Sequence, residues 1–153
     1  MIAILSRLLT NNFSEADLWE LEELQTTWTI EYGQEDGIVR VKMTGRATLE
    51  SLKRLATEAL AEAARHGADK FLVDDREMVP NIGTMDIYNL PDILQKLGMN
   101  HAHKVAVVFS ASSEKVEDFQ FYEARANNLG FGHRLFTSQE AALDWLMDRN
   151  GLS

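Results

Sequence analysis

Two stretches near the start of the chain alternate apolar and polar residues with a period of two. The first runs from Thr27 to Tyr32 and the second from Ile38 to Thr44, with the polar segment Gly33 to Gly37 between them. A period of two places successive side chains on opposite faces of a strand, and a short glycine-containing connection joins antiparallel strands. The pattern predicts a β-hairpin.

After the hairpin, helical stripes alternate with short apolar runs. A stripe with helical spacing follows the capping residue Thr48 and ends at His66 and Gly67. FLVDD and VAVVF, which ends at Phe109, have the composition of buried parallel strands, and His133 to Phe136 forms a last short one. This order predicts an α/β fold whose mixed, largely parallel five-stranded sheet is connected by crossover helices.

Three helix boundaries are predicted from local signals. Pro91 suits a first helical turn better than a helix interior, so we expect two helical pieces to meet there. Ser113 is the expected cap of the next helix. Thr137 and Glu140 have the spacing of a capping box at the start of the last one.

Residues 1–26 are predicted to form an N-terminal helical extension of a single α/β domain at 27–149. Leu5 and Leu9 recur at helical spacing, and Ser14 is placed to cap a second helix. This extension carries more apolar surface than a solvated tail needs. We therefore expect it to contribute to a homodimer interface, with packing on its own domain as the alternative.

Composition excludes several classes of protein. The 153 residues include no cysteine, which excludes disulfides, thiolate nucleophiles and cysteine zinc motifs and favours a cytoplasmic location. The opening MIAILSRLLTNN is short, contains Arg7 and lacks the features of a secretory leader. No segment approaches the ~20 apolar residues of a membrane span, so none is expected.

The charge of the chain makes nucleic acid an improbable partner class. Lys and Arg number 15 against 24 Asp and Glu, which gives a formal net charge of -9. Such a charge repels polyanions at long range. A basic protein partner stays open.

Four segments of the chain resemble one known family. They are GIVRVKMTGRATLESLKRL, KFLVDDR, HKVAVVFS and NNLGFGHRLFTSQEAALDWL, and together they extend over roughly Thr27 to Met147. They are similar to the SpoIIAA-like proteins, relatives of the STAS domain of anti-sigma-factor antagonists and sulfate transporters. The resemblance implies a STAS-like fold, which is also similar to lipid-binding SEC14 domains, and a regulatory or binding role.

The resemblance also implies a candidate phosphorylation site. In STAS switch proteins a strand that ends in aspartate leads to a helix that begins Asp-Ser-Ser-Gly, where the serine is phosphorylated. Here the strand ends in Asp74 and Asp75, and the helix start reads NIGTMD. Thr84 is therefore the possible phosphoacceptor, since a helix N-terminus favours a phosphate. The alternative is a helix cap.

Candidates for catalysis and metal binding are weak. Adjacent strand residues point to opposite faces, so Asp74 and Asp75 do not form an acid/base pair. One of them is expected to pair with Arg76 or Lys70 or to cap the loop amides that follow. The alternative is a carboxylate at the strand end that lines a crevice beside the loop 77–84.

The remaining motifs give no enzyme, cofactor or metal site. His101 and His103 have no evident third metal ligand, and His66 and His133 are expected at the surface or at helix ends. SASS after the VAVVF strand lacks a nucleophile elbow, and the sequence has no phosphate-binding glycine loop.

Taken together, the sequence predicts a non-enzymatic regulatory STAS-like module that binds a protein partner or a small apolar ligand. The expected recognition surface is the loop 77–86 with the adjacent helix. Its predicted site residues are Asp75, Arg76, Met78, Thr84, Met85 and Tyr88. The alternative is a carrier of a small apolar molecule or lipid, with a pocket lined by Met78, Met85, Ile87 and Tyr88.

Overall fold

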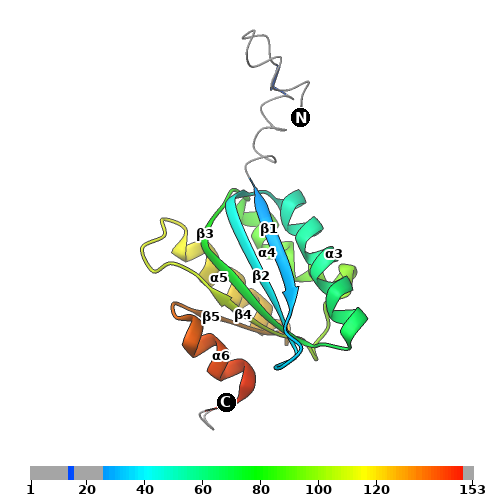
Figure 1. Ribbon diagram of the computed structural model, residues 1–153. Coiled ribbons are helices and arrows are strands. Elements are labelled where there is room, and N and C mark those ends of the chain that lie inside the picture. The colour runs from blue at the N-terminus through cyan, green and yellow to red at the C-terminus, as the bar shows by residue number, and fades with distance from the viewer. Residues whose placement is uncertain (1–13, 16–25, 150–153) are drawn as a thin grey trace, which may run out of the picture.

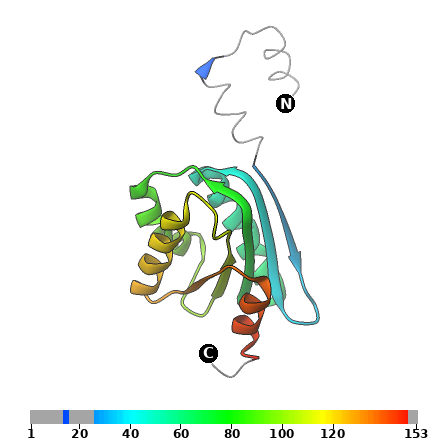
Figure 2. The same ribbon diagram turned by 90° about the vertical axis from the view of Figure 1, so that its left-hand side faces the viewer.

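A computed structural model describes residues 14, 15 and 26–149, and within them five strands form one sheet (Figure 1). The strands are β1 (Thr27–Tyr32), β2 (Ile38–Ala47), β3 (Lys70–Pro80), β4 (Lys104–Val108) and β5 (Gly132–Phe136). They lie in the order β1-β2-β3-β4-β5, with β1 antiparallel to β2 and every other pair parallel. The predicted mixed, largely parallel sheet is therefore confirmed, and Figure 2 shows its hairpin at one edge.

Helices α3 (Leu49–His66), α4 (Thr84–Leu97) and α5 (Val116–Asn128) are the crossovers between the parallel strands. Because such crossovers share one hand and the strands are added in sequence order, all three helices cover the same face of the sheet. Their core includes Val41, Met43, Phe71, Val105 and Val107 from the sheet and Leu55, Ala59, Leu94, Phe119 and Ala126 from the helices.

Helix α6 (Gln139–Met147) belongs to a second, smaller core. Ala142 and Leu146 of this helix pack with Ile38, Leu72 and Val108 of the strands. Figure 1 shows α6 apart from α3, at the lower left. The second face of the sheet is therefore covered by one helix.

Helix α3 has the predicted ends. The Thr48 hydroxyl accepts a hydrogen bond from the Ser51 backbone N–H, while the Ser51 hydroxyl accepts one from the Thr48 N–H. Gly67 ends the helix with φ 64, a left-handed conformation that glycine adopts without steric cost.

The other three predicted helix boundaries were wrong. Pro91 lies inside the continuous helix α4, where its ring is fully buried, so apolar packing offsets the hydrogen bond that proline cannot donate. Helix α5 begins two residues after the predicted start, because Ser113 accepts a hydrogen bond from the Lys115 N–H in a turn before the helix. The cap of α6 is Ser138, not Thr137.

Strand β3 contains one more residue than its partner β2 at the centre of the sheet. Lys42 of β2 lies opposite Asp74 of β3. Thr44, two residues after Lys42, lies opposite Glu77, which is three residues after Asp74. This bulge reverses the alternation of side chains along β3. The β3 side chains that face the space under α3, α4 and α5 are Phe71, Val73, Asp75, Met78 and Pro80.

The N-terminal helical extension and its expected homodimer interface lie outside the described residues, apart from Ser14, Glu15 and Thr26. Within the described part of the chain, none of the helices combines the length and the apolar character needed to traverse a bilayer.

Candidate functional site

An apolar cavity of about 160 Å³ lies between the sheet and helices α3, α4 and α5. Its apolar lining includes Leu52, Leu55, Ala56, Ala59, Phe71, Met78, Ile82, Ile87, Leu90, Leu94, Val107 and Phe119. Its titratable lining residues are Asp75, Asp118, Tyr122 and His133. An apolar cavity with a few polar groups is the usual form of a small-molecule site.

The alternation of β3 places the Asp75 carboxylate in this cavity, on the same side as Phe71 and Val73. The residue is only 8% exposed, and its Oδ1 has no hydrogen-bond partner among the described residues. Burial, and secondarily the negative charge of Asp74, raises the pKa of Asp75 to about 7. Close to neutral pH, this carboxyl therefore exists in both its protonated and its ionised form.

Tyr122 and His133 form a second polar group in the cavity wall. The Tyr122 hydroxyl lies 2.6 Å from Nδ1 of His133. Burial, with a smaller contribution from His103, lowers the pKa of His133 to about 4, and burial raises the pKa of Tyr122. At neutral pH both are therefore uncharged. Nε2 of His133 has no partner among the described residues.

The backbones of Asp75 and His133 are offset along the strands. Val105 pairs with both Phe71 and His133, so His133 lies level with Phe71. Asp75 follows Phe71 by four residues along β3, which is roughly 13 Å of strand. The charge of Asp75 nevertheless contributes, after burial, to the raised pKa of Tyr122, so the two polar groups act within one cavity wall.

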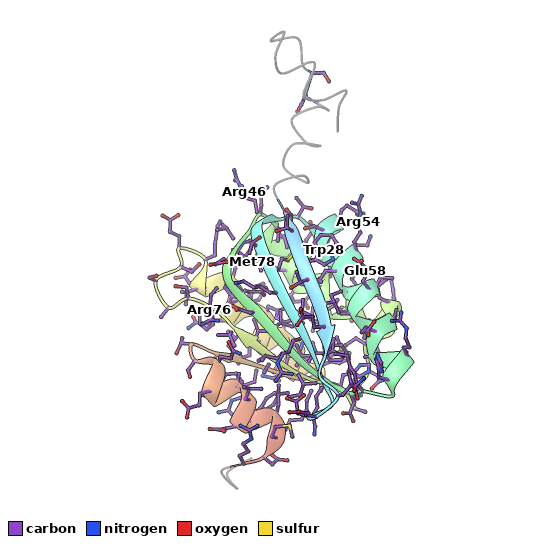
Figure 3. All side chains as sticks on the ribbon, in the orientation of Figure 1. Trp28, Arg46, Arg54, Glu58, Arg76 and Met78 are labelled. Atoms are coloured by element: carbon purple, nitrogen blue, oxygen red, sulfur yellow. The ribbon has the colours of Figure 1, made fainter. Side chains whose placement is uncertain are left out.

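The predicted site residue Arg76 lies on the opposite face of the sheet. Its guanidinium donates to both carboxylate oxygens of Asp74, at 2.9 and 2.8 Å, and to the side chain of Gln139 at 3.3 Å. The Arg76 guanidinium holds the pKa of Asp74 below its ordinary value. Figure 3 shows Arg76 next to the start of α6 and Met78 further along the same strand. The predicted pairing with Arg76 is thus formed by Asp74 and not by Asp75.

Three exposed apolar side chains form a separate surface, which we call the α4–α5 patch. Met85 is 68% exposed, Tyr88 41% and Phe121 38%. The Tyr88 and Phe121 ring centroids are 6.2 Å apart, and the Arg125 guanidinium lies 4.1 Å from the Tyr88 ring centroid. Arg125 also pairs with Asp92 at 3.3 Å, which ties α5 to α4.

The six predicted site residues are therefore separated by the fold. Asp75 and Met78 line the cavity, while Thr84, Met85 and Tyr88 are exposed at the start of α4. The pocket expected from Met78, Met85, Ile87 and Tyr88 was wrong for Met85 and Tyr88, which do not line the cavity. The loop expected at 77–84 was also partly wrong, because residues 77–80 continue β3 and pair with β2.

His133 was wrongly expected at the surface, since it is only 3% exposed. The signal that identifies it is the period of two in β5, where His133 and Leu135 point to the same side, as both line the cavity. Tyr122 lies on α5 and has no comparable signal, because its role depends on packing against β5.

Thr84 does not cap helix α4. Gly83 is the N-cap and no side chain makes a capping hydrogen bond, so the cap alternative for Thr84 was wrong. The Thr84 hydroxyl is exposed in the first helical turn, next to Met85. Phosphorylation at this position stays a prediction.

The two histidines considered as metal ligands make other contacts. The His101 ring packs edge-on against Phe131, with centroids 4.6 Å apart. Nδ1 of His103 accepts a hydrogen bond from the Asn100 N–H. In residues 14, 15 and 26–149, no three His, Cys, Asp or Glu residues are grouped closely enough to hold a metal ion.

No known protein family and no curated protein matches the chain. Several solved structures do, including the following two. One is an uncharacterized protein of the DUF3478 family with a SpoIIAA-like fold from Shewanella loihica, with 23% identity, 79% of this chain and 93% of the other covered, and a TM-score of 0.49. The other is an anti-sigma factor antagonist from Mycobacterium paratuberculosis, with 16% identity, the same coverage of 79% and 93%, and a TM-score of 0.53. The second likeness, together with the strand order and crossover helices, confirms the predicted SpoIIAA-like fold.

Proposed function

We propose that this chain is a non-enzymatic binding module that holds a small, largely apolar molecule between its sheet and helices α3, α4 and α5. The observation that carries the proposal is the 160 Å³ cavity, whose wall contains a buried carboxylate oxygen without a hydrogen-bond partner among the described residues. Perturbed titratable groups in an apolar cavity are typical of binding sites.

The volume of the cavity supports occupancy by a molecule. An apolar cavity of about 150 Å³ engineered in another protein binds benzene. A ligand that buries its apolar surface against this lining gains hydrophobic stabilisation.

The positions of the titratable groups favour binding over catalysis. Asp74 and Asp75 point to opposite faces of the sheet, as predicted from their adjacency. The Tyr122 hydroxyl is hydrogen-bonded to His133, and Oδ1 of Asp75 has no hydrogen-bond partner among the described residues. No titratable side chain is therefore hydrogen-bonded to that oxygen as the partner of an acid/base pair.

Filling the cavity is expected to abolish binding of ethylbenzene. Ala59 is buried and lines the cavity, so Ala59→Leu adds side-chain volume where the ligand would lie. Ala61→Leu is the matched control, because Ala61 is exposed on the same helix. Binding is measured by NMR of the methionine methyl groups: ethylbenzene should shift Met78 and Met99, which line the cavity, but not the exposed Met85.

Wild type and Ala61→Leu should bind ethylbenzene, and Ala59→Leu should bind at least about tenfold more weakly or not at all. Wild-type protein whose Met78 and Met99 methyl signals do not move at saturating ethylbenzene would contradict the proposal.

A second candidate function is recognition of a protein partner through the α4–α5 patch. Exposed Met, Tyr and Phe side chains grouped on two helices are typical of interface cores. Exposed Asp86 and Glu117 lie beside the patch in sequence, and the chain carries a net charge of -9. The partner we propose is accordingly a protein that presents an apolar surface with a basic rim.

A photo-crosslinking residue at Met85 tests this second function in the cells of origin. It should trap one partner that a crosslinker at Ala61 does not trap, and Phe121→Ser in the same chain should reduce the yield about tenfold or more. Phe121 is partly exposed, so this change should leave the fold intact. Identical products from both crosslinker positions, or a yield that does not depend on Phe121, would exclude the patch as the partner surface.

A further inference from the structure

The Asp75 end of the cavity contains acceptors but no donor from a basic side chain. Met78, Pro80, Ile82 and Phe119 form apolar lining, and the half-buried Asp118 adds a second carboxylate. No lysine or arginine among the described residues lines the cavity. The nearest guanidinium along β3, that of Arg76, is bound to Asp74 on the other face of the sheet.

An acceptor in such surroundings is costly. A buried carboxylate oxygen without a donor loses its hydration and gains nothing in return. Native proteins rarely leave such an atom without a partner, and an exception calls for an explanation. Asp75 Oδ1 and His133 Nε2 are the two such side-chain atoms in the described part of the chain.

We infer that Asp75 is the specificity determinant of the cavity and selects apolar molecules that carry one hydrogen-bond donor, an alcohol or an amine. The inference rests on the proposed function and adds the chemical class of the ligand. The donor hydrogen-bonds to Oδ1 of Asp75, while the apolar body lies against the aliphatic and aromatic lining. A hydrogen bond to a buried charged acceptor is worth more than one between neutral groups.

His133 does not serve as this anchor. Its Nδ1 is already within 2.6 Å of the Tyr122 hydroxyl, and a neutral imidazole costs less to leave unpartnered than a carboxylate. Asp86→Asn serves as the control, because Asp86 is an exposed carboxyl outside the cavity lining.

The test compares three molecules of equal heavy-atom number, ethylbenzene, benzyl alcohol and benzylamine, at pH 8. Kd values are measured by the same methionine methyl NMR for wild type, Asp75→Asn, Asp75→Leu and Asp86→Asn. The quantity of interest is the ratio of the ethylbenzene Kd to that of each donor molecule. Using this ratio cancels general changes in the cavity, because they affect all three molecules alike.

Asp75→Leu should lower both ratios by about tenfold or more, the equivalent of one hydrogen bond to a charged group. Asp75→Asn keeps a neutral acceptor, so it should retain the preference for benzyl alcohol, whose donor is a neutral hydroxyl. It should lose the preference for benzylamine, whose donor is a cation. Asp86→Asn should leave both ratios within about twofold of wild type, because this exposed carboxyl does not line the cavity.

Ratios that are the same in wild type and both Asp75 variants would overturn the inference while leaving the proposed function intact. Failure of all three molecules to bind wild type would overturn both. If Asp75→Leu does not fold, the isosteric Asp75→Asn and benzylamine comparison decides alone. A benzylamine ratio that is unchanged from wild type in Asp75→Asn counts against Asp75.

Discussion

Asp75→Asn is expected to stabilise the protein by about 4 kcal/mol more at pH 8 than at pH 4. Burial raises the pKa of this carboxyl from its ordinary value of 3.8 to about 7. A difference of this size corresponds to roughly 4 kcal/mol of pH-dependent stability. Between pH 3.8 and about pH 7 the folded chain keeps the proton on Asp75, whereas the unfolded chain has lost it. The stability that this proton provides is therefore fully present below about pH 4 and is lost as the pH rises through 7.

Asparagine resembles the protonated carboxyl and does not titrate, so the variant lacks this loss. The measurement is urea unfolding of wild type and variant at several values between pH 4 and pH 8, with Asp86→Asn as a control at an exposed carboxyl. Stability curves for wild type and Asp75→Asn that run parallel through this range would show that Asp75 is not buried as described.

The second large effect has the opposite sign and comes from His133. Burial lowers the pKa of this imidazole from its ordinary value of 6.5 to about 4. The contribution of neutral His133 to the stability of the folded chain is present above pH 6.5 and is lost as the pH falls toward 4, because the unfolded chain binds the proton first. The folded state loses roughly 3 kcal/mol of stability over this range. His133→Asn is expected to remove it, although the variant is less stable at every pH through lost packing.

The two titrations oppose each other, so the stability of the wild type should depend less on pH between pH 4 and pH 7 than that of either variant. In Asp75→Asn the buried His133 and, to a smaller extent, His103, whose pKa is also lowered by burial, remain, and stability should fall on acidification. In His133→Asn the loss of the Asp75 contribution with rising pH dominates, and stability should rise on acidification. The same slope in both variants would contradict the assignment of these two groups to the cavity wall.

The sequence predicts the fold because its signals are local and repeated. The alternation in residues 27–32 and 38–44, the buried run at Val105 to Val108 and the capping residue Thr48 each specify an element without tertiary information. Pro91 is the instructive failure. Its local preference for a helix start is overridden by burial of its ring in the core, and no local pattern reports on that burial.

The site was predicted less completely because it depends on one backbone irregularity. A regular strand with alternating faces would send Met78 to the side opposite Asp75, yet the bulge after Asp74 brings both into the cavity. A bulge of this kind leaves no clear mark in the sequence. The exposure of Met85 and Tyr88 likewise follows from how α4 packs, which places Ile87 of the same helix inward.

A native mass spectrum of the protein purified from its own host tests the central claim, occupancy of the cavity by a small apolar molecule, most directly. The wild-type chain should carry the additional mass of one small organic molecule, and Ala61→Leu should carry it too. Ala59→Leu, whose cavity is filled, should have the mass of the bare chain. Bare chains in all three samples, or the same added mass on Ala59→Leu as on the wild type, would contradict the account.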